Sequence, residues 1–241
     1  MSGHSKWSTI KHQKSANDAK RGKIFSKLAK DIAVAVREGG SGESENNPRL
    51  RLIIEKARAE NMPKDNIQRA IDRGSGHGEG AQLESIVYEG FGPNNTAVVV
   101  ECVTDNRNRS AQEIKGYFDK RGGRIASQGS VNYLFDKKGE ISVAKEGNEE
   151  EQMLSLIDCG AEDIASKDGK LLVYTEPDKL HQVVEAIRGK TAFNILEAEL
   201  IYKPKAEKII EDQAQIDRII DFLDGLDELE DVQRIFFDIK L

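Results

Sequence analysis

Residues 139–202, GEISVAKEGNEEEQMLSLIDCGAEDIASKDGKLLVYTEPDKLHQVVEAIRGKTAFNILEAELIY, decide the fold class. Segments with extended character are interrupted twice by segments whose apolar residues recur at helical spacing. Two strands flank the turn Lys-Asp-Gly, and Pro177 opens the second helix. In chain order, we expect a strand, a helix, two strands, a helix and a strand at 139–144, 148–160, 161–166, 170–176, 177–189 and 193–202. This β-α-β-β-α-β order is ferredoxin-like.

The segments on either side of this unit predict a second α+β domain. The expected elements are two strands, a helix and extended chain before the unit, and a helix and a strand after it: 83–92, 96–105, 108–123, 123–135, 214–230 and 232–239. The last strand has no neighbour of its own, and an unpaired strand must find a partner. We therefore expect residues 232–239 to join the sheet of residues 80–135, which makes the ferredoxin-like unit an insertion in a discontinuous domain.

The first 75 residues predict a small helical domain. Apolar residues recur at spacings of three and four within 25–36, 50–57 and 67–71. The first helix is expected to begin at Ser15 with a capping-box-like start, and Pro48 is expected in the first turn of the second helix. The chain is therefore predicted to be an α+β multidomain protein, a three-helix domain followed by two α+β domains. The expected boundaries are 1–75, 76–135 plus 205–241, and 136–204 for the inserted ferredoxin-like domain.

Charge is distributed unevenly along the chain. Residues 1–73 hold 16 Lys and Arg against 9 Asp and Glu, whereas residues 140–241 hold 12 against 25. The net charge of the whole chain is −6, which hides this contrast. A basic head on an acidic body is typical of a molecule whose head is attracted to a polyanion.

Several functional classes find no support in the sequence. No stretch approaches the ~20 apolar residues of a membrane span, and no apolar core of a secretory signal follows the basic start, so we expect a cytoplasmic protein without membrane contact. Phosphate-loop, serine-hydrolase and zinc-protease motifs are absent. Cys102 and Cys159 lack metal-ligand spacing and are expected to be reduced, packed thiols. We predict no metal, no cofactor and no enzymatic activity; an enzyme with a site between the α+β domains is the remote alternative.

The head is a candidate nucleic-acid-binding segment. Its cations precede or begin the first helix, where they can follow a phosphate backbone, and Trp7 offers a flat ring for stacking on an unpaired base. Lys27 and Lys30 continue the charge along the helix. The alternative is that Trp7 covers the helical core and the lysines are ordinary solvated surface. The candidate residues of the head are His4, Lys6, Trp7, Lys11, His12, Lys14, Lys20, Arg21 and Lys23.

The turn before the helix at 108–123 is a second candidate patch. Two guanidinium groups lie at a helix start that Ser110 could cap, which suits recognition of a phosphate or a carboxylate. The alternative is that these arginines pair with local carboxylates. The candidate residues are Arg107, Asn108 and Arg109, their extension is Lys120, Arg121 and Arg124, and the local carboxylates are Asp105 and Glu113.

The ferredoxin-like unit shares its order of elements with RNA-recognition motifs. Its third expected strand offers only one aromatic residue, Tyr174, and residues 140–204 hold 7 Lys and Arg against 14 Asp and Glu. Because RNA-recognition motifs stack bases on several aromatic side chains, we do not expect RNA on this sheet. Contact with a protein, or a role as a spacer, is the favoured interpretation.

Four motifs together resemble one known family. They are GHSKWSTIKHQKSANDAKRGKIFSKLAKDI at 3–32, NMPKDNIQRAI at 61–71, YEGFGPNNTAVVVECVTDNRNR at 88–109 and GGRIASQGSVNYLF at 122–135. The chain resembles the YebC/PmpR family, which includes the mitochondrial translational activator of cytochrome oxidase. The resemblance implies a helical domain and two α+β domains, one inserted in the other. It also implies either a DNA-binding transcriptional regulator or a translation factor that acts on the ribosome, including at proline-rich stalls.

The combined prediction is a non-enzymatic, cytoplasmic, nucleic-acid-binding regulator of gene expression. A lysine-rich tail with an aromatic ring suits irregular RNA, and an acidic body suits docking among basic proteins. This favours a ribosome-associated translation factor that relieves stalls at proline-rich stretches. The expected partners are ribosomal RNA, tRNA and ribosomal proteins, and the expected oligomeric state is a monomer. The alternative is a transcriptional regulator that binds promoter DNA.

Overall fold

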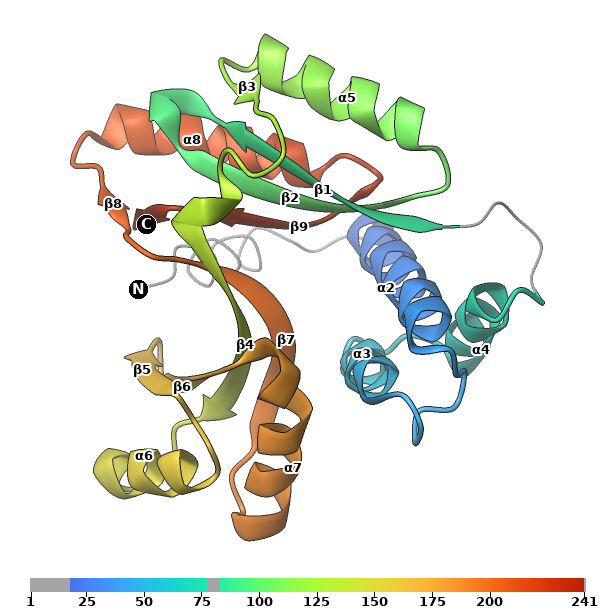
Figure 1. The fold of residues 1–241 in the computed structure, drawn as a ribbon, viewed down its shortest axis with the longest axis vertical. Coiled ribbons are helices and arrows are strands. Elements are labelled where there is room, and N and C mark those ends of the chain that lie inside the picture. The colour runs from blue at the N-terminus through green and yellow to red at the C-terminus, as the bar shows by residue number, and fades with distance from the viewer. Residues whose placement is uncertain (1–17, 78–82, 241) are drawn as a thin grey trace. The chain divides into compact units, whose positions relative to one another are not determined.

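The computed structural model describes residues 18–77 and 83–240 (Figure 1). By their internal packing these residues form two compact units, one of residues 136–203 and one of the other described residues. Within the described ranges, no helix is long and apolar enough to cross a lipid bilayer. The three domain boundaries expected from the sequence stay a prediction.

The unit of residues 136–203 has the predicted β-α-β-β-α-β order. Its elements are β4 (Phe135–Ala144), α6 (Glu149–Asp158), β5 (Asp163–Lys167), β6 (Lys170–Thr175), α7 (Leu180–Lys190) and β7 (Ile195–Pro204). The sheet order is β5-β6-β4-β7, and β6 runs antiparallel to both β4 and β5. Ile141 of β4 lies opposite Val173 of β6, and both side chains are fully buried. The predicted α+β class is therefore confirmed for this unit.

Two turns in this unit follow from local sequence. Asp168 and Gly169 connect β5 to β6 with φ values of 46° and 75°. Two left-handed residues in succession are what a type I′ hairpin turn requires, so Asp-Gly is the expected pair there. Pro177 opens a short 3-10 helix, Pro177–Lys179, and α7 begins at Leu180. The predicted start of the α-helix at Pro177 is therefore wrong.

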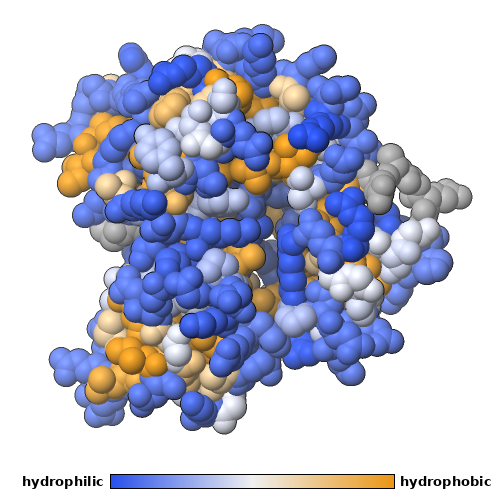
Figure 2. Space-filling view, in the orientation of Figure 1, coloured by the Kyte–Doolittle hydropathy of each residue, from blue (hydrophilic) through white to orange (hydrophobic). Residues whose placement is uncertain are grey.

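The outer face of α6 is apolar. Leu154 and Ile157 lie three residues apart on this helix and are exposed, and Figure 2 shows apolar residues over this helix. Three glutamates occupy the first turn of the same helix. An apolar face next to carboxylates suits protein contact, and the expectation of such contact for this unit stays a prediction.

The other unit contains a four-stranded sheet in the order β3-β1-β2-β9. Its elements are β1 (Glu84–Phe91), β2 (Ala97–Thr104), α5 (Arg107–Lys120), β3 (Arg124–Ile125), α8 (Gln213–Asp227) and β9 (Val232–Phe237). β9 pairs antiparallel with β2, from Val98 opposite Phe237 to Cys102 opposite Val232. The predicted pairing of this last strand is confirmed, whereas the insertion of residues 136–204 as a separate domain stays a prediction. A parallel pair of two-residue strands, β8 (Lys208–Ile209) and β10 (Ile239–Lys240), was not predicted.

The core of this sheet lies under α5 and α8, which pack on the same face (Figure 1). Phe118 of α5 and Phe222 of α8 meet edge to face, with ring centroids 5.1 Å apart. Cys102 of β2 belongs to the same buried cluster. Cys102 and Cys159 are both free and buried, as predicted.

Replacing Gly90 with Ala is expected to destabilise this core. A Cβ at Gly90 would lie 2.5 Å from Cε1 of Phe118 and 2.8 Å from the carbonyl oxygen of Arg124. Overpacking of this kind costs about 1 to 3 kcal/mol, which urea unfolding measures. The matched control is Gly116→Ala in α5, where an added Cβ has no described neighbour within 4 Å. Helix propensity alone predicts that Gly116→Ala raises the free energy of unfolding by about 1 kcal/mol. Equal effects of the two substitutions would contradict this packing.

The helices α2 (Asp18–Gly39), α3 (Pro48–Ala59) and α4 (Lys64–Gly74) share an apolar core. Asn47 links two of them. Its side-chain oxygen accepts a hydrogen bond from the N–H of Leu50 (3.1 Å) and caps α3, while its amide nitrogen donates to the carbonyl of Ala35 in α2 (2.8 Å). Pro48 occupies the first turn of α3, as predicted. The predicted helix start at Ser15 lies outside the described residues.

Candidate nucleic-acid interface

The predicted head residues divide into two groups. Six of them lie outside the described residues: His4, Lys6, Trp7, Lys11, His12 and Lys14. The rest lie in α2, where Lys20 is placed by its backbone and Arg21 is exposed. The exposed guanidinium group of Arg21 is therefore the first described side chain that can contact a polyanion.

Three lysines further along α2 form ion pairs with carboxylates of the same chain. Lys23, Lys27 and Lys30 follow at spacings of four and three, which places them on one face of the helix. Their partners all belong to residues 227–231, here called the acidic segment, at the end of α8 and before β9. The ion pairs are Lys23 with Glu228 (2.9 Å), Lys27 with Asp227 (2.8 Å) and Lys30 with Asp231 (2.9 Å). The expectation that Lys27 and Lys30 continue the open charge of the head is therefore corrected.

Asp231 is the centre of this contact. Its side chain is only 3% exposed, and one oxygen, Oδ2, accepts hydrogen bonds from Thr104, Ser110 and Arg109, while the other receives Lys30. Burial by itself would raise the pKa of Asp231, but the hydrogen bonds from Ser110, Lys30 and Arg109 outweigh burial and hold this pKa at about 2. Asp231 thus ties α2, the end of β2 and the start of α5 together as an ionised carboxylate.

Apolar contacts accompany these ion pairs. Ala33 and Val34 of α2 form a buried cluster with Leu83 and with Val103 of β2. The lysines of α2 lie on the acidic segment, and its small apolar residues lie on β2. Ion pairs and apolar burial therefore both fix α2 to the sheet β3-β1-β2-β9.

The second predicted patch lies at the N-terminus of α5. Arg107 and Asn108 are exposed, and the side chain of Arg107 makes no hydrogen bond or ion pair with the described residues. Arg109 is half exposed and forms ion pairs with Asp231 and Asp105, both at 3.0 Å. The alternative prediction, that these arginines pair with local carboxylates, is therefore confirmed for Arg109 and Asp105. Arg107 is the cation of this patch that remains open.

The predicted role of Ser110 as a helix cap is wrong. The cap is Asn106, whose side-chain oxygen accepts a hydrogen bond from the N–H of Arg109 (3.1 Å). Ser110 is buried one turn later and donates to Asp231 instead. An Asn side chain one residue before a helix competes well with a serine, because both residue types favour the capping position.

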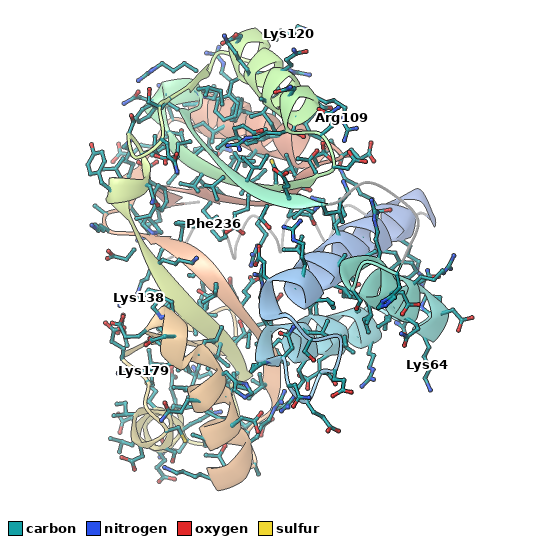
Figure 3. All side chains as sticks on the ribbon, turned by 45° about the vertical axis from the view of Figure 1, so that its right-hand side comes forward. Lys64, Arg109, Lys120, Lys138, Lys179 and Phe236 are labelled. Carbon is teal, nitrogen blue, oxygen red and sulfur yellow. The ribbon has the colours of Figure 1, made fainter. Side chains whose placement is uncertain are left out.

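The predicted extension of this patch lies at the other end of α5. The helix has 14 residues, which separates its ends by about 20 Å. Arg109 and Lys120 stand at opposite ends of it in Figure 3. Arg124, beyond Lys120, is held over the ring of Phe91 (4.5 Å) and donates to the side chain of Asn95 (2.7 Å). The cations at 120–124 therefore form a separate group from Arg107.

Sequence reasoning missed one buried carboxylate near that group. Glu89 lies in β1 and is 4% exposed, and its carboxylate accepts hydrogen bonds from the backbone N–H groups of Gly129, Val131 and Asn132, each at 2.7 Å. Burial would raise the pKa of Glu89, but these three hydrogen bonds lower it below the usual value. The strand β1 reads ESIVYEGF and has a second acidic residue, Glu84, which is exposed, so the available signal was only the interior position of Glu89 beside Gly90.

Within the described residues, no group of three His, Cys, Asp or Glu side chains is arranged to hold a metal ion. The described part of the candidate interface therefore consists of open cations, Arg21 and Arg107, beside cations that are already paired. Exposed guanidinium groups of this kind can form paired hydrogen bonds to a phosphate or a carboxylate.

Comparisons with known proteins agree on one family. A family model described as "TACO1/YebC protein N-terminal domain" matches residues 5–77, and one described as "TACO1/YebC second and third domain" matches residues 83–239. Two similar relatives, from Finegoldia magna and Caldanaerobacter subterraneus, are named "Probable transcriptional regulatory protein". The protein from Finegoldia magna is 46% identical, and the match covers 98% of this chain and 97% of the relative. The protein from Caldanaerobacter subterraneus is also 46% identical, and the match covers 100% of this chain and 99% of the relative.

A solved structure has the same fold. It is the crystal structure of a conserved hypothetical protein from Aquifex aeolicus, with a TM-score of 0.84, 42% identity, and coverage of 92% of this chain and 91% of that one. The resemblance inferred from the four sequence motifs is thus confirmed over essentially the whole length. The chain belongs to the TACO1/YebC family.

Proposed function

We propose that this protein is a nucleic-acid-binding regulator of gene expression that acts on ribosomal RNA as a translation factor, relieving stalls at proline-rich stretches. The observation that carries the proposal is the basic head, with 16 Lys and Arg against 9 Asp and Glu in residues 1–73 of a chain whose net charge is −6. Electrostatic attraction of this kind supplies most of the sequence-independent affinity for phosphate backbones. The regulatory names of the relatives support the general class.

The structure narrows the set of contacts that the proposal uses. Because Lys23, Lys27 and Lys30 are paired with the acidic segment, the proposal uses Arg21 and Arg107 among the described side chains. Arg109 serves the second patch indirectly, since it ties the start of α5 to Asp231. The proposed contact residues are His4, Lys6, Trp7, Lys11, His12, Lys14, Lys20, Arg21, Arg107 and Asn108.

RNA is favoured over duplex DNA for two reasons. A DNA reader needs a helix with free polar side chains for base edges. In α4, the side chain of Gln68 bonds to that of Asp72 (2.9 Å) and the side chain of Arg69 bonds to that of Asn66. The head, in contrast, combines cations with Trp7, and such a ring suits an unpaired base. Ribosomal proteins are basic partners that an acidic body tolerates, and a monomer suffices for this role.

Replacing Lys6, Lys11 and Lys14 together with Glu is expected to weaken binding to ribosomal RNA and to flatten its salt dependence. If each lysine contacts one phosphate, the negative slope of log K against log salt concentration becomes shallower by about 2 for a single-stranded site and by about 3 for a duplex site. Fluorescence anisotropy of the full chain over a range of salt concentrations measures both quantities. The matched control replaces Lys170, Lys179 and Lys190, exposed lysines of residues 136–203, with Glu. An equal loss in both variants, or an unchanged slope in the head variant, contradicts the phosphate role.

The relatives' names favour a second candidate, a transcriptional regulator bound to promoter DNA. In-cell ultraviolet crosslinking of the tagged protein, with bound RNA and DNA both sequenced, separates the two. Crosslinks in ribosomal RNA that disappear in the head variant support the translation factor. Discrete promoter peaks with background RNA identify the transcriptional regulator instead.

A further inference from the structure

The buried carboxylate of Glu89 fixes the loop after β3. Three backbone N–H groups within four residues, those of Gly129, Val131 and Asn132, all donate to its two oxygens at 2.7 Å. The backbone carbonyl of Glu89 also accepts the N–H of Ala126. Charge-assisted hydrogen bonds are about twice as strong as neutral ones, so the side chain of Glu89 holds residues 129–132 firmly, while its backbone carbonyl holds Ala126. We call residues 126–133 the Glu89 loop.

The interior of the Glu89 loop is also ordered by its own backbone. The N–H of Ser130 bonds to the carbonyl of Ser127 (3.0 Å), and Gly129 has a φ of 85°, as position i+2 of a type II turn requires. Val131 is fully buried and anchors the loop. A loop with this many fixed points presents its outward side chains in one arrangement, so binding orders little further chain.

The outward side chains of this loop are of types that can bind a nucleic-acid base. They are polar groups and one ring: Ser127, Gln128, Ser130, Asn132 and Tyr133. Tyr133 is 65% exposed, and it is the one aromatic residue among the large apolar side chains that are exposed in the described ranges. An exposed ring gains by stacking on the flat face of a base, and amide side chains can bond the edge of the same base.

The charged residues of 120–135 are all basic, although Asp119 and Asp136 lie directly before and after this range. Residues 120–135 contain Lys120, Arg121 and Arg124 and no Asp or Glu, in a chain that is acidic as a whole. Glu89, a carboxylate that the loop contacts, is buried and accepts three backbone hydrogen bonds. Arg124 is held in place by Phe91 and Asn95. The segment therefore attracts a polyanion locally, independently of the head.

We infer that the Glu89 loop is a second RNA-contact site, which binds an unpaired base by stacking on Tyr133. Gln128 and Asn132 offer hydrogen bonds to the base edge, and the cations at 120–124 contact the flanking phosphates. The inference rests on the proposed function for its ligand, RNA, but not for its site, since the loop lies on different elements from the head.

The test compares Tyr133→Ala with Tyr133→Phe in the full chain. The probes are a fluorescent single-stranded RNA of mixed sequence and the same RNA annealed to its complement. Loss of stacking is expected to weaken single-stranded binding by about 5- to 150-fold in Tyr133→Ala, with duplex binding unchanged and with Tyr133→Phe close to wild type. The matched control is Leu154→Ala, which removes a similarly exposed apolar side chain from α6.

The outcomes separate the two proposals. If Tyr133→Ala binds single-stranded RNA as tightly as wild type while the head variant does not, the loop inference is overturned and the proposed function stands. If wild type binds no RNA, both are overturned. Equal losses for single-stranded and duplex RNA exclude stacking and overturn the inference.

A second variant tests the role of the carboxylate. In Glu89→Gln, an amide group faces backbone N–H groups that need an acceptor, so the loop is expected to loosen while Tyr133 stays. Faster hydrogen exchange at residues 129–132, together with weaker binding to single-stranded RNA, supports a preorganised site. Faster exchange with unchanged affinity overturns this role of Glu89, and should this variant fail to fold, the Tyr133 pair still decides.

Discussion

Replacing Asp231 with Ala is expected to lower the free energy of unfolding by about 3 to 5 kcal/mol, as for other buried ion pairs that lose one partner. The substitution removes the acceptor for Lys30, Arg109, Ser110 and Thr104 at once. Lys30 and Ser110 are then left in a largely buried position without that partner. Urea unfolding followed by far-ultraviolet circular dichroism measures the loss.

The control for this prediction is Asp221→Ala, which removes an exposed carboxylate from α8. Its effect is expected to stay within about 0.5 kcal/mol, as for surface substitutions generally. Asp231 also predicts an acid dependence. Its pKa of about 2 lies below the value of 3.8 for an unperturbed Asp, so its contribution is present above pH 3.8 and is lost as the pH falls through 2. A variant whose stability equals that of Asp221→Ala would show that the contact carries little energy.

Replacing Glu140 with Gln is expected to stabilise residues 136–203 at alkaline pH. Burial, followed by the charges of Glu199 and Glu197, raises the pKa of Glu140 to about 7 from 4.5. A raised pKa means that the ionised carboxylate costs stability: the contribution of the neutral form is complete below pH 4.5 and is lost as the pH rises through 7. The shift corresponds to about 3 kcal/mol above pH 8.

Glutamine keeps the shape of Glu140 and cannot ionise. Glu140→Gln is therefore expected to gain up to that amount at pH 8.5 and nothing at pH 4.5, measured by thermal or urea unfolding at both values. Glu146→Gln, in the exposed loop after β4, is the matched control and is expected to change little at either pH. The same gain at both pH values would point to packing rather than to titration.

Local pattern predicted the elements that depend on neighbours in sequence. The β-α-β-β-α-β order follows from periodicity within each segment, and the pairing of β9 with β2 follows from the need of a strand for a partner. The expectation of extended chain from 123 to 135 was largely wrong, since only Arg124, Ile125 and Phe135 lie in strands. The carboxylate of Glu89 accepts hydrogen bonds from the backbone N–H groups of residues 129, 131 and 132. No pattern within residues 123–135 predicts these bonds, because the acceptor lies in β1.

The candidate site shows the same limit. Counting charges places the lysines of α2 in one basic region, but a count does not show which of them are neutralised by distant carboxylates. Lys30 and Asp231 are 201 residues apart in sequence and 2.9 Å apart in space. Arg107 and Arg109 differ by two positions, yet one is open and the other is bound, because only Arg109 reaches Asp231. Partners at such separations are properties of the fold.

The pairing of β2 with β9 has a consequence for synthesis of the chain. Residues 97–104, which read AVVVECVT, lie between β1 and β9, and β9 comprises residues 232–237 near the end of the sequence. While the nascent chain is shorter than this, β2 has β1 on one side and an open, valine-rich edge on the other. Residues 136–203 contain the four strands of a separate sheet, β5-β6-β4-β7, and can fold before β9 is synthesised and pairs with β2. Residues 232–237 thus close the sheet, and a translation product that stops before them leaves an edge on which other chains can pair.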